Sequence, residues 1–78
     1  MSLHETMDLK DVVAGNVRRT RHAKSMTQEE LADRVGLSPR YIGSVERATA
    51  SPTVTVLGKL AKALDVEPSV LVTMRKPR

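Results

Sequence analysis

A predicted short helix over residues 39–47 has one face that could form hydrogen bonds with a large polar partner. At about 100° per residue, one arc of this helix holds Arg40, Gly43, Ser44 and Arg47. The apolar Ile42 and Val45 lie opposite and are expected to face inward. Guanidinium groups beside small residues suit the major groove of DNA, where arginine binds guanine or phosphate. Gly43 costs about 1 kcal/mol of helix stability relative to alanine, and close approach to a partner is one reason to accept that cost. The alternative is a solvated face with an incidental glycine.

Residues 26–47 as a whole predict two short helices joined by a tight turn. Both helix starts carry capping signals, namely Thr27 with Glu30 (a capping box) and Ser38 with Pro39 (an N-cap and a first helical residue). Gly36 between them can take the left-handed conformation that ends a helix. Two capped helices with so short a connection must cross steeply, which is a helix-turn-helix pattern.

The composition predicts one small helical domain. A chain of 78 residues has room for a single modest core, and with no Phe or Trp and one Tyr that core must be aliphatic. A net charge of +4 and an isoelectric point near 10.0 favour an anionic partner. The absence of cysteine excludes thiol chemistry and disulfides. No signal peptide and no apolar run long enough to cross a membrane is found, so we expect a soluble, cytoplasmic protein.

Caps and apolar stripes place the remaining elements. Residues 1–7 predict a flexible N-terminal arm, residues 8–73 the folded domain and residues 74–78 a basic tail. Asp8 should cap a first helix whose inner face holds Leu9, Val12, Val13, Val17 and Thr20. Thr53 should cap a later helix with the stripe Val56, Leu57, Leu60, Ala61 and Leu64. Pro68 opens a final short helix that ends at Leu71 or Val72.

A cluster of cations lies toward the end of the first predicted helix, at Arg18, Arg19, Arg21 and Lys24. The helix dipole favours cations there, which accounts for part of the cluster. We expect at least one of the four, with Arg19 as the candidate, to contact phosphate and so to position the protein on a nucleic acid rather than to read its sequence.

Several spaced motifs resemble the lambda-repressor-like helix-turn-helix family of the Cro/CI or XRE type. They are Gln28-Glu-Glu-Leu-Ala, Gly36-Leu-Ser, Tyr41-Ile42, Glu46-Arg47 and Lys59-Leu-Ala-Lys-Ala-Leu, within a match from about residue 9 to residue 71. The resemblance implies an all-α, five-helix domain with a central helix-turn-helix. It also implies sequence-specific binding of double-stranded DNA by a small transcriptional regulator, a repressor or a controller protein of a restriction–modification system, with residues 39–47 in the major groove.

The resemblance also implies roles for individual residues. Gln28 would contact a phosphate and brace the recognition helix, while Pro39, Arg40, Tyr41 and Ser44 match positions that reach bases or nearby phosphates. Because Pro39 has no polar side chain, base reading should shift to Arg40 and Ser44. For Tyr41 the alternative is an aromatic at the edge of the core. Arg47 is expected to meet phosphate, and Thr27 and Ser38 would contact phosphate only beside their capping roles.

Two further positions compare with the family in opposite ways. Arg21 and Glu46 match an arginine and a glutamate that pair in the family, so the resemblance implies a partly buried ion pair between the first helix and the recognition helix. Ala48 stands where the family usually has a glycine, and the loop after it lacks the basic residues often found there.

The last predicted helix and the residue inventory bear on partners and on rival functions. The final helix offers Val66, Val70, Leu71, Val72 and Met74, more apolar surface than so short an element can bury, so we expect a homodimer on a two-fold operator; the alternative is ordinary closure of the core. His4 and His22 lack partners, so we expect no metal site. With no cysteine, no glycine-rich phosphate loop and no paired carboxylates in a plausible cleft, we expect no catalytic site, and we expect no cofactor and no small-molecule ligand. The rival function is a protein-interaction module, such as an antitoxin-like partner.

Overall fold

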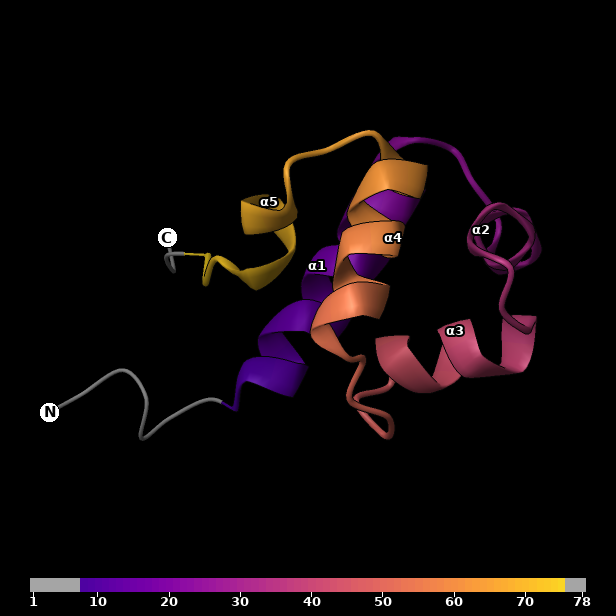
Figure 1. The fold of residues 1–78 in the computed structure, drawn as a ribbon. Helices are drawn as coiled ribbons and strands as arrows, with labels where there is room; N and C mark the ends of the chain where they lie inside the picture. The colour runs from indigo at the N-terminus through magenta and orange to yellow at the C-terminus, as the bar shows by residue number, and fades with distance from the viewer. Residues whose placement is uncertain (1–7, 76–78) are drawn as a thin grey trace, which may run out of the picture.

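Side-chain caps set the starts of four of the five helices in the computed structural model, which describes residues 8–75. The helices are α1 (Leu9–Ala23), α2 (Gln28–Val35), α3 (Pro39–Glu46), α4 (Val54–Leu64) and α5 (Pro68–Val72) (Figure 1). The capping side chains, each of which accepts a hydrogen bond from a backbone N–H, are Asp8, Thr27, Ser38 and Thr53. The all-α, five-helix prediction is confirmed. The predicted arm, residues 1–7, and the last three residues of the predicted tail lie outside the described part of the chain.

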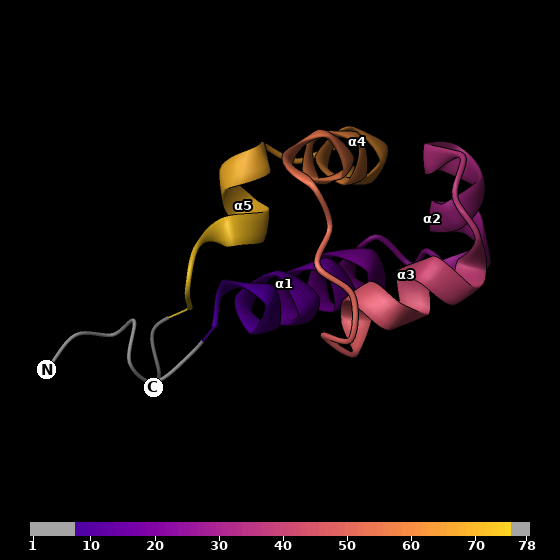
Figure 2. The same ribbon diagram turned by 60° about the horizontal axis from the view of Figure 1, so that its bottom comes forward.

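An aliphatic core lies between α1 and α4, and the other helices close its ends. The α2–α3 pair lies on one side of α4, and α5 lies on the other (Figures 1 and 2). Helix α1 packs against α3 and α5, while α4 packs against α2 and α5. The largest fully buried side chains are Leu31, Ile42, Leu60, Leu64, Leu71, Val17 and Val45. One residue predicted to face inward does not: Leu9 is 56% exposed, because it is the first residue of α1 and lies beyond the reach of the core.

Left-handed residues follow four of the five helices, and the first of them is Ser25 (φ 54°), just after α1. Gly36 has φ 73° and ψ 31°, and the next residue, Leu37, donates its N–H to the carbonyl of Ala32 at 3.0 Å, which turns the chain from α2 into α3. Asp65 ends α4 in the same conformation. Ala48, just after α3, has φ 61°. A residue with a Cβ costs roughly 1–2 kcal/mol in this region. Ala48 therefore makes, with some strain, the turn that a glycine would make without it.

Asn16 holds α5 against α1, and nothing in the sequence pattern marks it for that role. Its side chain is buried, and its amide nitrogen donates to the carbonyl oxygens of Leu71 (3.0 Å) and Thr73 (2.9 Å). Both carbonyls belong to the end of α5, where a helix leaves acceptors without partners of its own. The Asn16 oxygen in turn accepts a hydrogen bond from Arg19. One side chain of α1 therefore caps the last helix across a long stretch of sequence.

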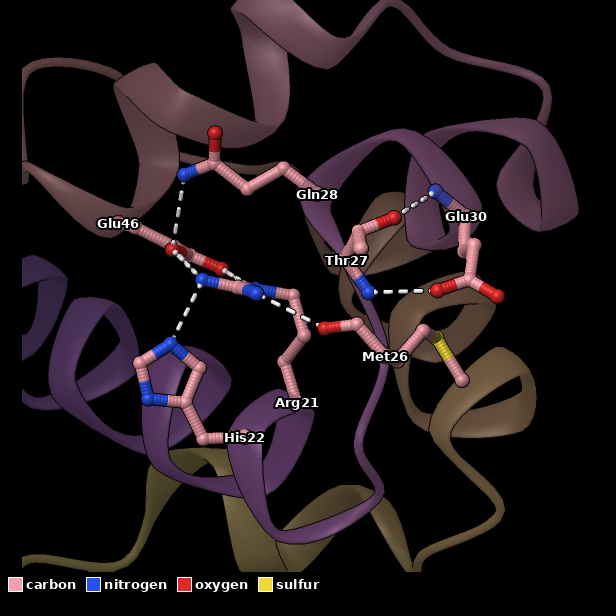
Figure 3. A network of polar contacts seen from close by, with 7 residues as sticks. All are labelled: Arg21, His22, Met26, Thr27, Gln28, Glu30 and Glu46. Carbon is pink, nitrogen blue, oxygen red and sulfur yellow. Dashed lines mark hydrogen bonds and ion pairs between the residues drawn. The ribbon is translucent and has the colours of Figure 1, made fainter.

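A buried network around Arg21 and Glu46 joins α1, α2 and α3 (Figure 3). Arg21 Nε donates to Glu46 Oε2 at 2.7 Å, and Arg21 Nη2 donates to Glu46 Oε1 at 3.0 Å. Arg21 Nη1 donates to the carbonyl oxygen of Met26 at 2.8 Å, in the turn before α2. From the other side, Gln28 Nε2 donates to Glu46 Oε1 at 3.0 Å. The network therefore fixes α3 from behind, on the side opposite Arg40 and Ser44.

The charges of this network stabilise each other despite their burial. Burial alone would raise the pKa of Glu46, but the hydrogen bonds from Arg21 and Gln28 and the charge of Arg21 outweigh it, and the pKa lies below its usual value of 4.5. The hydrogen bond to Glu46 raises the pKa of Arg21, against the opposing effect of burial. Both groups are therefore charged at neutral pH, and each satisfies the other in a place that water hardly reaches.

Replacing Glu46 should destabilise the fold strongly. Glu46→Ala leaves the Arg21 guanidinium buried without its carboxylate, and breaking one side of a buried pair costs roughly 3–5 kcal/mol. Thermal unfolding followed by circular dichroism should therefore show a clear fall in the melting temperature. Glu67→Ala is a matched control, because Glu67 is exposed and its side chain makes no cap hydrogen bond. Equal melting temperatures for Glu46→Ala and the unchanged protein would contradict the clamp.

The stability should also fall in acid, and Glu46 should account for part of that fall. Because its folded pKa is lowered, the stabilisation is fully present above the usual pKa of 4.5 and is lost as the pH falls through the folded value. Glu46→Gln should be less stable at neutral pH and should lose less of its free energy of unfolding on acidification. Glu30 also has a lowered pKa, because of its hydrogen bonds with Thr27, but it is present in both the unchanged protein and Glu46→Gln. Its contribution to the pH dependence is therefore the same in the two proteins. Urea unfolding at several pH values measures this difference, and identical pH slopes would refute it.

Candidate nucleic-acid interface

The outer face of α3 presents two arginines and one serine, as predicted, but not an open glycine. Arg40 and Arg47 are exposed and Ser44 is half-buried. The Ser44 hydroxyl donates to the carbonyl oxygen of Arg40 at 3.1 Å, so its oxygen still has lone pairs to offer a partner. Gly43, expected to lie open on this face, is instead buried. The cause is Arg47, whose Nη1 lies 2.9 Å from the point where a Cβ on Gly43 would stand.

The start of α3 combines a cap, a proline and an aromatic that faces the core. The Ser38 hydroxyl accepts from the N–H of Tyr41 at 3.1 Å, and exposed Pro39 is the first residue of the helix. Tyr41 is only half exposed and packs against the hydrophobic core. Its environment therefore fits the core-edge alternative, although its partial exposure still leaves part of the side chain on the surface. The predicted helix 39–47 ends one residue earlier, at Glu46, with Arg47 as its C-cap.

At the start of α2, two predicted contact residues already have partners within the chain. Thr27 is exposed, and its hydroxyl and N–H both bond with Glu30 in the capping box, at 3.0 Å and 2.8 Å. Gln28 gives its amide nitrogen to Glu46, which links α2 to α3 (Figure 3). Thr27 therefore caps α2, and Gln28 links α2 to α3. A contact of either residue with a phosphate would use atoms or lone pairs that these hydrogen bonds leave free.

Arg19 lies apart from the residues on α2 and α3. Its guanidinium donates to Asn16 and lines a groove between α1 and α5, together with Lys24 and Arg75. The reason is helical geometry: Arg19 precedes Arg21 by two residues, so it points about 200° away around α1. Since Arg21 faces α3, Arg19 cannot face the same way. The structure does not bring Arg19 together with the other predicted contact residues.

The loop after α3 contributes backbone rather than charge. The N–H groups of Thr49 and Ala50 donate to the carbonyl oxygen of Ser44 at 2.9 and 3.3 Å, which folds the loop back onto α3. Its side chains up to Pro52 are small and uncharged. Among residues 8–75, His, Asp and Glu form no group that could hold a metal ion. In the same part of the chain no helix is long and apolar enough to cross a membrane.

Comparison with known proteins agrees with this geometry. A helix-turn-helix family model matches residues 17–71. The HTH-type transcriptional regulator y4dJ of Sinorhizobium fredii, itself uncharacterised, is 45% identical over 67 residues, which cover 86% of this chain and 87% of that protein. The control protein C.SmaI of Serratia marcescens is also 45% identical over 67 residues, covering 86% of this chain and 80% of that protein.

A solved structure extends the comparison to three dimensions. The restriction-modification controller protein C.Esp1396I was crystallised as a tetramer in complex with its natural 35 base-pair operator. It matches this fold with a TM-score of 0.76 at 32% sequence identity, covering 83% of this chain and 86% of that chain. The family match, the shared fold and the identity over most of the sequence lead to one conclusion. This chain belongs to the helix-turn-helix family of transcriptional regulators.

Proposed function

We propose that this protein is a transcriptional regulator that binds a specific double-stranded operator with α3 in the major groove. One observation carries the proposal: the outer face of α3 is basic and exposed at Arg40, while Glu46 on its inner side is locked to Arg21 and Gln28. A reading helix must be held rigidly for its side chains to meet base edges in a fixed register. The relative C.Esp1396I, crystallised on its operator, supports the same use of this fold.

Arg40 is the residue we propose to read a base. It is exposed in the first turn of α3, the part of a recognition helix that contacts base edges. Its guanidinium can bind O6 and N7 of a guanine together. Ser44, one turn later on the same arc, can accept from or donate to a neighbouring base. Thr27, Gln28, Ser38 and Arg47 remain our candidates for phosphate contacts around this centre, with Pro39 and Tyr41 in van der Waals contact.

We also propose that the protein acts as a homodimer through α5. Leu71 is fully buried and closes the core, so the core-closure alternative holds for that residue. Val70 and Val72 nevertheless remain 43% and 38% exposed on a five-residue helix. A second copy could cover them, and helix-turn-helix dimers commonly bind two half-sites about 34–36 Å apart on one duplex. The tetramer of C.Esp1396I on DNA supports an assembly of more than one chain.

The rival function is weaker because of what α3 exposes. A protein-interaction module that used this face would need apolar side chains there, whereas the face consists of Arg40, Ser44 and Arg47. A regulator of this kind needs no catalytic group or cofactor, and we propose that it is not an enzyme and that it acts in the cytoplasm, where such an operator would lie.

Selection of duplexes from a random library tests the proposal directly. The unchanged protein should select one sequence motif, and Arg40→Ala should lose the preference for one base pair of that motif, worth roughly 1–3 kcal/mol. Lys59→Ala, at an exposed position of α4 beside the end of α2, serves as a control. If Arg40→Ala selects the same motif, Arg40 does not read a base. If the binding that the selection detects is insensitive to salt, it does not rest on phosphate contacts, and the protein-interaction function gains support.

Sedimentation tests the homodimer. At micromolar concentration the protein should sediment as a dimer, and the double change Val70→Asp with Val72→Asp should yield monomers. Both side chains are exposed, so the fold should survive, and circular dichroism checks that it does. A strictly monomeric protein bound to the selected DNA would refute the dimer.

A further inference from the structure

The side chain of Arg47 lies across Gly43, one helical turn before it. A Cβ built on Gly43 would have Arg47 Nη1 at 2.9 Å, Cζ at 3.7 Å and Nη2 at 3.8 Å, and these are the nearest atoms outside the adjoining residues and the helix backbone. Real Cβ atoms essentially never show a contact as short as the first of these. The guanidinium therefore occupies space that exists only because residue 43 has no side chain.

This contact moves the charge of Arg47 along the recognition helix. Arg47 is the C-cap of α3, and its N–H donates to the carbonyl oxygen of Gly43 at 3.0 Å. Side chains in a helix lean toward its N-terminus, and four residues correspond to about 6 Å along the axis. By folding back over Gly43, the guanidinium leaves the end of the helix and lies at the middle of the face that also carries Arg40 and Ser44.

The position of this guanidinium is not explained by an acidic partner. Within residues 8–75 the one salt bridge joins Arg21 to Glu46, so neither Arg40 nor Arg47 has an acidic partner there. Two guanidinium groups on one arc of α3 repel each other and favour an anionic or acceptor-rich surface opposite them. The floor of the major groove, with guanine O6 and N7, is such a surface.

From these contacts we infer that Gly43 is a positioning residue and that Arg47 reads a second base in addition to Arg40. Because Gly43 has no side chain, the Arg47 guanidinium can lie on the outer face of α3, beside Arg40 and Ser44. The effects of the two residues on DNA binding should therefore be coupled, and we treat them as one unit. The inference rests on the proposed function. It replaces the phosphate contact proposed there for Arg47 with a base contact, and it replaces the expectation from the sequence that Gly43 serves close approach of the helix backbone.

A double-mutant cycle tests the unit. Gly43→Ala adds one methyl group that displaces the guanidinium, the far end of a flexible side chain, so the helix should fold at least as well as before. Affinity for the duplex selected by the unchanged protein should fall at least about fivefold, the low end of one paired base contact. In an Arg47→Ala background, Gly43→Ala should change affinity less than about twofold, because the displaced group is already gone. Equal losses in both backgrounds would overturn the inference.

Gly58→Ala provides the matched control. Gly58 lies within α4, is exposed, and has no atom within 4 Å of the place that a Cβ would take. Gly58→Ala therefore adds the same helix-favouring methyl group without displacing a neighbour, and affinity should stay unchanged.

The selected motif separates base reading from phosphate contact. Arg47→Ala should relax the preference at one base pair other than the one that depends on Arg40, and Arg47→Lys should relax it too, because lysine lacks the planar fork. Uniformly weaker binding with every preference intact would make Arg47 a phosphate contact and overturn the inference. If the unchanged protein selects no motif at all, the proposed function itself fails, which is a different result from a motif that ignores Arg47.

Discussion

The pair formed by Arg21 and Glu46 is the interaction on which the presentation of α3 depends. Its partners come from α1 and α3, and Gln28 and the Met26 carbonyl bring in α2 and the turn before it. Without this network the contact between α1 and α3 would be apolar packing alone, which is not directional. Hydrogen bonds with fixed geometry set the rotation of α3 about its own axis, and that rotation decides which side chains reach outward. The cost is a buried charge pair, whose net contribution to stability is small when it is intact.

The sequence predicts local structure well because its signals are local. Single capping residues correctly locate four helix starts, and Gly36 marks the left-handed turn. The amphipathic stripe of α4 is also correct at Leu60, Ala61 and Leu64. The prediction for Leu9 is wrong because periodicity says which side of a helix is apolar but not how far the core extends along it. The pairing of Arg21 with Glu46 comes from family resemblance, since nothing local links residues 25 positions apart.

The side chains that act over distance are the ones the sequence could not locate. Asn16 gives no signal, because its partners are carbonyl oxygens more than 50 residues away. Gly43 falls on the correct arc, but an angular plot cannot show that a long side chain from the next turn lies over it. The spacing of a glycine four residues before an arginine is the available clue. It recurs in α1, where the Arg19 guanidinium lies 3.2 Å from a Cβ position on Gly15. The roles of individual residues on DNA remain predictions.

The hydrogen bonds from Asn16 to the end of α5 have a consequence for the order of folding. A helix of five residues cannot persist by itself in water, and α5 has no side-chain cap at its start. The Asn16 donor reaches the last carbonyls of α5 only when α1 is formed and docked, so we expect this long loop to close late. The α2–α3 pair, in contrast, has its caps and its turn close together in the sequence. We therefore expect the surface proposed for dimerisation to form last, so that a nascent or partly unfolded chain has its DNA-binding elements before it can recruit a second copy.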